Sequence, residues 1–190
     1  MSDVLEALLQ SVLNIQGAGD FQACGSRRSS HPGIIFPDGD ELALPLSRAQ
    51  AREISSMAEV APYGKGEETI RDDSVRKCWQ MDASELRWIE PKWSKTTKRI
   101  VQDVSKDLGV EGQVKAEPYK LLLHGEGGFF LPHRDTEKLG EMFGTLIIAL
   151  PSRHEGGELL IRHGGEEVPI DFSQSDPRGS SENSRSKISS

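Results

Sequence analysis

The sequence predicts an α+β domain, with helices in its first part and a strand-rich sheet in its second. Apolar residues recur at helical spacing near the N-terminus and again after Pro91, whereas residues 113–172 read as short strands separated by turns. Helices followed by strands suit a barrel-like sheet with helices on one side. A length of 190 residues with 35% hydrophobic content fits one domain with a modest core.

Residues 1–32 are predicted to form a helix followed by a loop. The helix has apolar residues on one face, and the acidic residues Asp3 and Glu6 argue against a signal peptide. The loop, residues 16–32, is rich in Gly, Ser and charge. We expect the helix to dock on the domain that follows.

Residues 33–44 read as a hairpin, because short apolar runs flank a Pro-Asp-Gly-Asp turn. Ser47 followed by Gln50 is a capping-box signature that predicts a helix to near Val60. A second, longer helix is predicted to start at Pro91 and to stop at Gly109. Between the two helices, residues 75–81 and 86–89 have strand character.

Five strands are predicted after the second long helix, and together with the preceding elements they make residues 33–172 one domain. They are Gln113–His124, Phe129–Asp135, Phe143–Leu150, Glu158–His163 and Val168–Phe172. Residues 173–190 are different, since eight of these 18 residues are serine and only one is aliphatic. Such a segment buries too little apolar surface to offset the entropy of ordering, so a disordered tail is expected.

Charge and composition exclude some classes of function. The formal net charge is −7, from 23 basic and 30 acidic residues, which disfavours a nucleic-acid-binding surface. No segment approaches the roughly 20 apolar residues that a membrane helix requires. The two cysteines, Cys24 and Cys78, suit reduced thiols. An intracellular protein, cytoplasmic or nuclear, is therefore expected.

His133 and Asp135 are the strongest candidates for functional residues. On an extended strand, side chains two residues apart point to the same face, so this imidazole and this carboxylate would converge on one ion. They would supply two of the three ligands of the 2-His-1-carboxylate triad that holds Fe(II) in oxygenases. The spacing alone also fits a hydrogen-bonded histidine beside an acid at a strand end.

The setting of this pair is more specific than its spacing. A Gly-rich turn and two phenylalanines precede it, and the runs 143–152 and 155–165 follow. This block resembles the Fe(II)- and 2-oxoglutarate-dependent dioxygenases of the prolyl 4-hydroxylase type, especially fungal proteins with this domain. The resemblance covers residues 44–171. It implies a double-stranded β-helix, or jelly roll, with N-terminal flanking helices, and hydroxylation of a C–H bond.

The resemblance also assigns residues. It implies that His133 and Asp135 bind iron and that His124 takes the place of a tyrosine near 2-oxoglutarate, although a solvent-facing histidine is an alternative. Tyr119 would line the same pocket, unless it belongs to an ordinary alternating strand. The family's second iron histidine and its 2-oxoglutarate arginine have no counterpart, because only His154 and His163 follow Asp135. We therefore expect an incomplete roll that ends before the second histidine.

Three interpretations stay open at this stage. The chain is an oxygenase acting on an unnamed protein or small molecule, or an inactive remnant or binding module of that family. A cupin-like metal protein is the third, but it would normally show two histidines one residue apart. A roll that stops early would leave an open sheet edge and uncovered apolar residues such as Leu146, Ile148 and Leu160, so self-association is also expected.

Overall fold

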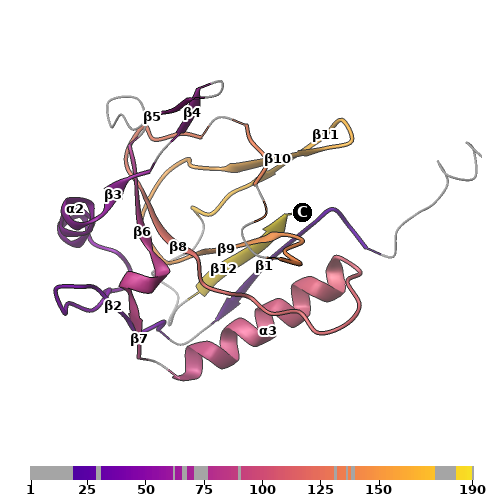
Figure 1. Cartoon of the computed structure of the whole chain (residues 1–190), viewed down its shortest axis with the longest axis horizontal. Coiled ribbons are helices and arrows are strands. Elements are labelled where there is room, and N and C mark those ends of the chain that lie inside the picture. The colour runs from indigo at the N-terminus through magenta and orange to yellow at the C-terminus, as the bar shows by residue number, and fades with distance from the viewer. Residues whose placement is uncertain are drawn as a thin grey trace, which may run out of the picture.

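A computed structural model of the chain shows a mixed α+β fold with few helices and several small antiparallel sheets (Figure 1). It describes residues 19–28, 31–61, 63–65, 68–70, 77–89, 91–130, 132–135, 137, 140–173 and 183–189. The helices are α2 (Arg48–Met57), η1 (Ala83–Glu85, a 3-10 turn) and α3 (Pro91–Asp107). The strands are β1 (Gln22–Arg28), β2 (Ile34–Ile35), β3 (Glu59–Val60), β4 (Tyr63–Lys65), β5 (Glu68–Ile70), β6 (Cys78–Asp82), β7 (Arg87–Trp88), β8 (Lys120–His124), β9 (Thr145–Ala149), β10 (Leu159–His163), β11 (Glu166–Ile170) and β12 (Asn183–Ser189).

The strands of the described residues form five sheets. Two sheets have three strands each, in the orders β1-β12-β9 and β3-β6-β8, and three are two-stranded pairs, β2-β7, β4-β5 and β10-β11. Every pairing between these strands is antiparallel. The pair β6–β8 sets Cys78 opposite His124 and Asp82 opposite Lys120, and so fixes the strand that leads toward the candidate site.

The predicted start of α2 is confirmed, but the helix ends at Met57 instead of near Val60, because residues 59–60 form β3. Ser47 is the N-cap, and its hydroxyl accepts a 3.1 Å hydrogen bond from the backbone N–H of Gln50. The Gln50 side chain binds elsewhere, because its amide oxygen accepts from Ala43 N–H and its amide nitrogen donates to Glu41 O. The capping residue was therefore predicted correctly, while the glutamine ties the helix to the second arm of the predicted hairpin.

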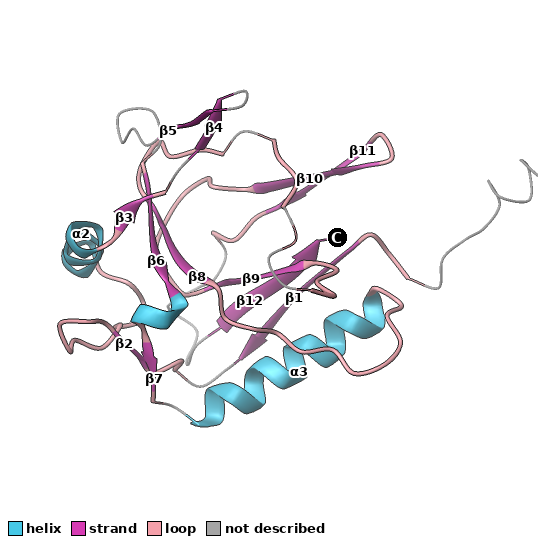
Figure 2. Ribbon diagram, viewed as in Figure 1, coloured by secondary structure: helices cyan, strands magenta, loops and turns pink. Residues whose placement is uncertain are grey.

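The predicted α3 is also confirmed at both ends. It starts at Pro91, and Gly109 follows its C-terminus with φ 65°, a left-handed conformation that glycine adopts without strain. Its buried residues Ile100 and Val104 pack with Ala23 of β1, and Leu108, Leu146 and Ile148 adjoin this cluster. α3 thus covers one face of the β1-β12-β9 sheet, as Figure 2 shows.

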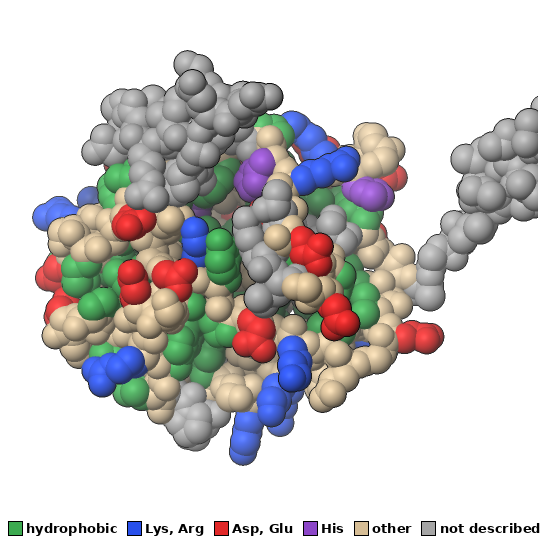
Figure 3. All heavy atoms as spheres, in the orientation of Figure 1, with side chains coloured by type: hydrophobic (Ala, Val, Ile, Leu, Met, Phe, Trp, Pro, Cys, Tyr) green, Lys and Arg blue, Asp and Glu red, His purple; other side chains and the backbone are tan. Residues whose placement is uncertain are grey.

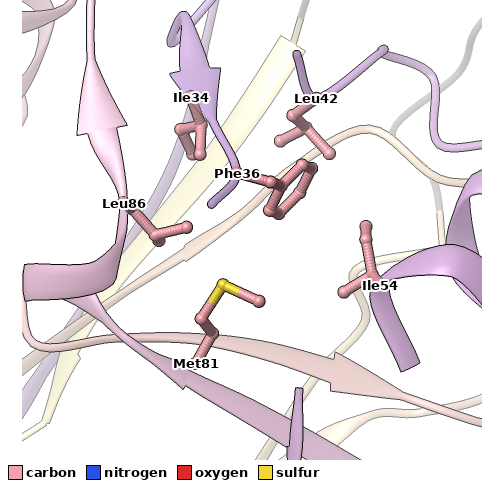
Figure 4. Packing of buried hydrophobic residues seen from close by; sticks show 6 residues of the cluster. All are labelled: Ile34, Phe36, Leu42, Ile54, Met81 and Leu86. Carbon is pink, nitrogen blue, oxygen red and sulfur yellow. The ribbon is translucent and has the colours of Figure 1, made fainter. Parts of the chain in front are cut away.

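A second core lies between α2 and the sheets around β2 and β6. Six buried side chains converge there in Figure 4. They are Ile34, Phe36, Leu42, Ile54, Met81 and Leu86. Leu121 and Leu123 of β8 pack against this cluster, so β8 is anchored on its apolar side. The predicted hairpin holds here, since Leu42 N–H donates to Ile34 O at 2.8 Å.

Toward both ends of the chain, the structure has strands where the sequence predicted none. β1 lies within the predicted loop, residues 16–32, and β12 lies within the predicted disordered tail, residues 173–190. β12 runs between β1 and β9 and pairs with both. Its backbone is satisfied by strands distant in sequence, which local composition does not encode. The predicted N-terminal helix lies outside the described residues.

Two further differences concern the predicted edges. Leu146 and Ile148 were expected to be uncovered, yet β9 pairs with β12 and both residues pack with the α3 cluster. Leu160 on β10 is exposed, as expected. β4 and β5 pair with each other in a part of the chain for which the sequence predicted no strand. Among the described helices, none is long and apolar enough to cross a bilayer.

Candidate functional site

His133 and Asp135 lie in the irregular segment between β8 and β9. The strand predicted over residues 129–135 was wrong, because none of the described residues in that range belongs to a strand. A turn precedes them, closed by the 2.9 Å hydrogen bond from Gly128 N–H to Gly125 O. Pro132 lacks an N–H group for a ladder and restricts the residue before it, so this stretch is poorly suited to a paired strand.

The two side chains nevertheless meet. His133 Nε2 lies 3.6 Å from Asp135 Oδ1, and the side chains are 57% and 49% exposed. With ligand bonds of about 2.1 Å and octahedral angles, two neighbouring ligand atoms lie roughly 3 Å apart. The nitrogen and the oxygen are therefore close to the separation at which both reach one divalent ion, and solvent has access to both.

Thr145, the first residue of β9, holds the acidic member of the pair. Its hydroxyl donates a 2.6 Å hydrogen bond to Asp135 Oδ2. One carboxylate oxygen of Asp135 thus accepts a hydrogen bond from the first residue of β9, while the other oxygen faces His133. Groups that hydrogen-bond to a metal ligand orient it and tune its affinity. Sequence reasoning missed Thr145, although it is the one hydroxyl residue of β9.

Aromatic rings connect His133 to the end of β8. The Phe130 ring centroid lies 5.9 Å from that of His133 and 5.0 Å from that of His124. Such offset and tilted ring pairs stabilise one another beyond the area they bury. The structure therefore brings His124 into the same cluster as the His133–Asp135 pair, with Phe130 between the two imidazoles.

Tyr119 lies at the opposite end of β8. Its carbonyl accepts a 2.9 Å hydrogen bond from Ala83 N–H, and its ring lies 5.0 Å from Lys120 Nζ. With a rise of about 3.3 Å per residue, Tyr119 and His124 are separated by roughly 17 Å along the strand. Of the two predicted cosubstrate residues, the structure brings His124 to the pair and leaves Tyr119 at a distance.

The remaining downstream histidines are engaged elsewhere. His154 Nδ1 lies 3.1 Å from both the hydroxyl and the carbonyl oxygen of Ser152. The His163 ring stacks on Phe21 at a centroid distance of 4.8 Å. Within the part of the chain that the structure describes, no three His, Cys, Asp or Glu side chains gather closely enough to hold a metal ion.

The pair belongs to the lining of a wide hollow, which is formed mainly by β8, β9, β10 and the segments that join them. Its volume of about 5630 Å³ far exceeds the 300–1,000 Å³ typical of small-molecule pockets. It is an open concavity rather than a formed pocket. Phe129, Phe130 and Phe143 line the same hollow and are exposed, and Figure 3 shows apolar side chains at the surface among charged ones on one face of the molecule.

No family model, curated protein or solved structure matches this chain.

Proposed function

We propose that this chain is a protein of the Fe(II)/2-oxoglutarate dioxygenase type, in which His133 and Asp135 are two ligands of a divalent metal ion. The observation that carries the proposal is the 3.6 Å approach of His133 Nε2 to Asp135 Oδ1 in the lining of an open hollow. Imidazole and carboxylate together are the donor types that hold Fe(II) in oxygenases of this class.

The fold is part of the same proposal. Strands of several small antiparallel sheets contribute to the lining of the hollow, α3 covers one sheet, and this arrangement is compatible with a jelly roll. The hydrogen bond from Thr145 adds support, because it binds the carboxylate of the pair to a strand of the sheet.

The described residues do not complete an iron centre of this class. Such a centre needs a second histidine, and the described His154 and His163 contact Ser152 and Phe21 instead. The function proposed for the described residues is therefore metal binding with two protein ligands, in which water would fill most of the coordination sphere. Hydroxylation of a C–H bond is proposed only for a site that a further ligand completes.

Titration of the chain with Mn(II), a divalent ion that is stable in air, tests the proposal. We expect one weak site by calorimetry, and a further loss of at least about ten-fold in affinity in His133→Ala and Asp135→Asn. His154→Ala is the matched control and should bind as the unchanged chain does. Equal binding in His133→Ala and the unchanged chain would show that the metal lies elsewhere.

A second candidate is a non-catalytic binding module that uses the same concavity. The exposure of Phe129, Phe130 and Phe143 favours it, because exposed aromatic side chains around a concave surface are typical of binding sites. The two candidates differ in whether metal is needed. Ligand binding that persists in Asp135→Asn and in the presence of a chelator would favour the binding module.

A further inference from the structure

β12 occupies the middle of a sheet although its two neighbours are remote in sequence. Seven of its residues are in register with β1, from Gln22 opposite Ser189 to Arg28 opposite Asn183. On its other side, residues 185–189 are in register with β9. Removing this one strand would leave two facing edges, each with a row of backbone donors and acceptors that lack their partners.

The one aliphatic residue of β12 is in register with apolar residues of both neighbouring strands. Ile188, the one aliphatic residue of the segment 173–190, is aligned with Ala23 of β1 and with Leu146 of β9. Ala23 and Leu146 belong to the cluster that packs against α3. The aliphatic residue of the segment is therefore in register with residues of an apolar cluster.

Every other residue of β12 is polar. Its position thus depends mainly on backbone ladders with two neighbours, and these ladders are the same whether the strand belongs to the same chain or to another one. Exchange of an identical element between protomers is a low-cost route to a dimer for this reason.

We propose that the slot between β1 and β9 is a strand-binding site, and that the strand it accepts in trans is residues 183–189 of a second copy of this chain. β12 fills the slot of its own chain in the monomer and the slot of a partner in the exchanged dimer. This proposal is independent of metal binding by His133 and Asp135.

Ser186→Pro tests the two roles of the chain separately, since the variant should be unable to donate β12 but should still offer a slot that accepts a strand. Proline in a central strand removes a ladder hydrogen bond, so this variant should lose its own β12 while it keeps an intact slot. Ser190→Pro, one residue beyond the end of β12, is the matched control. The probe is a fluorescent peptide with the sequence of residues 183–189, and a second peptide carries proline at the position of Ser186.

We expect the probe to bind the Ser186→Pro chain at least about ten-fold more tightly than the unchanged chain or Ser190→Pro, as measured by fluorescence anisotropy. The proline peptide should bind none of them. Ser186→Pro alone should not form the exchanged dimer in sedimentation experiments, because it has no strand to donate. Equal probe binding to all chains, or binding of the proline peptide, would overturn the proposal.

Hydrogen exchange of the unchanged chain gives a second test that needs no substitution. Excess probe should displace β12, so amides 183–189 should exchange faster while amides 22–28 and 145–149 keep their protection. If all three segments keep their exchange rates at saturating probe, the slot does not accept a strand in trans.

Discussion

The hydroxyl of Thr145 donates a 2.6 Å hydrogen bond to Asp135 and thereby couples the first residue of β9 to the candidate metal ligands. Asp135 lies in an irregular segment, so this bond is a direct link between its carboxylate and a sheet. The link leaves Asp135 Oδ1 facing His133 Nε2. The position of the acid therefore depends on a residue ten places further along the chain.

Thr145→Val should lower the affinity for Mn(II) by about 10-fold, because the variant keeps the shape of the side chain and removes the donor that orients Asp135. Thr145→Ser retains a hydroxyl and should lose much less. Calorimetry measures both affinities, and urea unfolding checks that the fold is intact. Identical affinities for the valine and serine variants would mean that the hydrogen bond does not position the carboxylate.

Conversion of 2-oxoglutarate to succinate should stay at background for the purified chain supplied with Fe(II). The described residues offer two protein ligands, and a cosubstrate carboxylate removed from water needs a fixed cation beside it. Succinate can be measured by mass spectrometry, with Asp135→Ala as the control. Iron-dependent succinate formation that disappears in Asp135→Ala would show that another residue or a partner chain completes the site.

The parts of the fold that were predicted correctly carry their signals locally. Ser47 caps α2, Pro91 opens α3 and Gly109 follows its last turn, and each of these residues acts within a few positions of its own place. β1 and β12 carry no comparable signal. They are strands because each pairs with a distant segment, and such a pairing outweighs the local preferences of Gly, Ser and charged residues.

In the candidate site, too, local sequence signals could be predicted, whereas contacts between different elements could not. Spacing and resemblance made His133 and Asp135 candidates, and the structure brings them within 3.6 Å, but without the strand that was expected to align them. The contacts of Thr145 and Phe130 with these residues cross turns and loops. Sequence periodicity describes only the residues of one element, so contacts of this kind could not be read from it.

Ser47→Ala should lower the free energy of unfolding by about 1 kcal/mol, because the backbone N–H of Gln50 loses its capping acceptor. Ser56→Ala is the matched control within the same helix. The Ser56 hydroxyl bonds back to Glu53 O, and alanine has a higher helix propensity, so this variant should be neutral or slightly stabilising. Urea unfolding monitored by circular dichroism measures both, and equal losses would contradict a capping role.

Asp82 caps the η1 turn, and acid should weaken this cap. The side-chain and backbone hydrogen bonds from Ser84 lower the pKa of Asp82 from its ordinary value of 3.8. Because the folded pKa is depressed, the stabilisation is present above pH 3.8 and is lost as the pH falls through the lowered value. Ser84→Ala should raise the pKa of Asp82 toward its ordinary value in a carboxyl NMR titration. An unchanged titration midpoint would show that the serine hydroxyl is not the cause.

Ile100→Ala tests whether α3 holds the β1-β12-β9 sheet. Ile100 is 2% exposed and packs with Ala23 and Val104, so truncation should cost about 2–5 kcal/mol through lost burial and the cavity left behind. Ile89→Ala is the matched control, since Ile89 is 58% exposed and its loss should stay within about 0.5 kcal/mol. Hydrogen exchange should also show faster exchange at residues 22–28 in Ile100→Ala, because the helix that covers β1 is weakened. Similar small losses in the two variants would mean that the sheet is stable without the packing of α3.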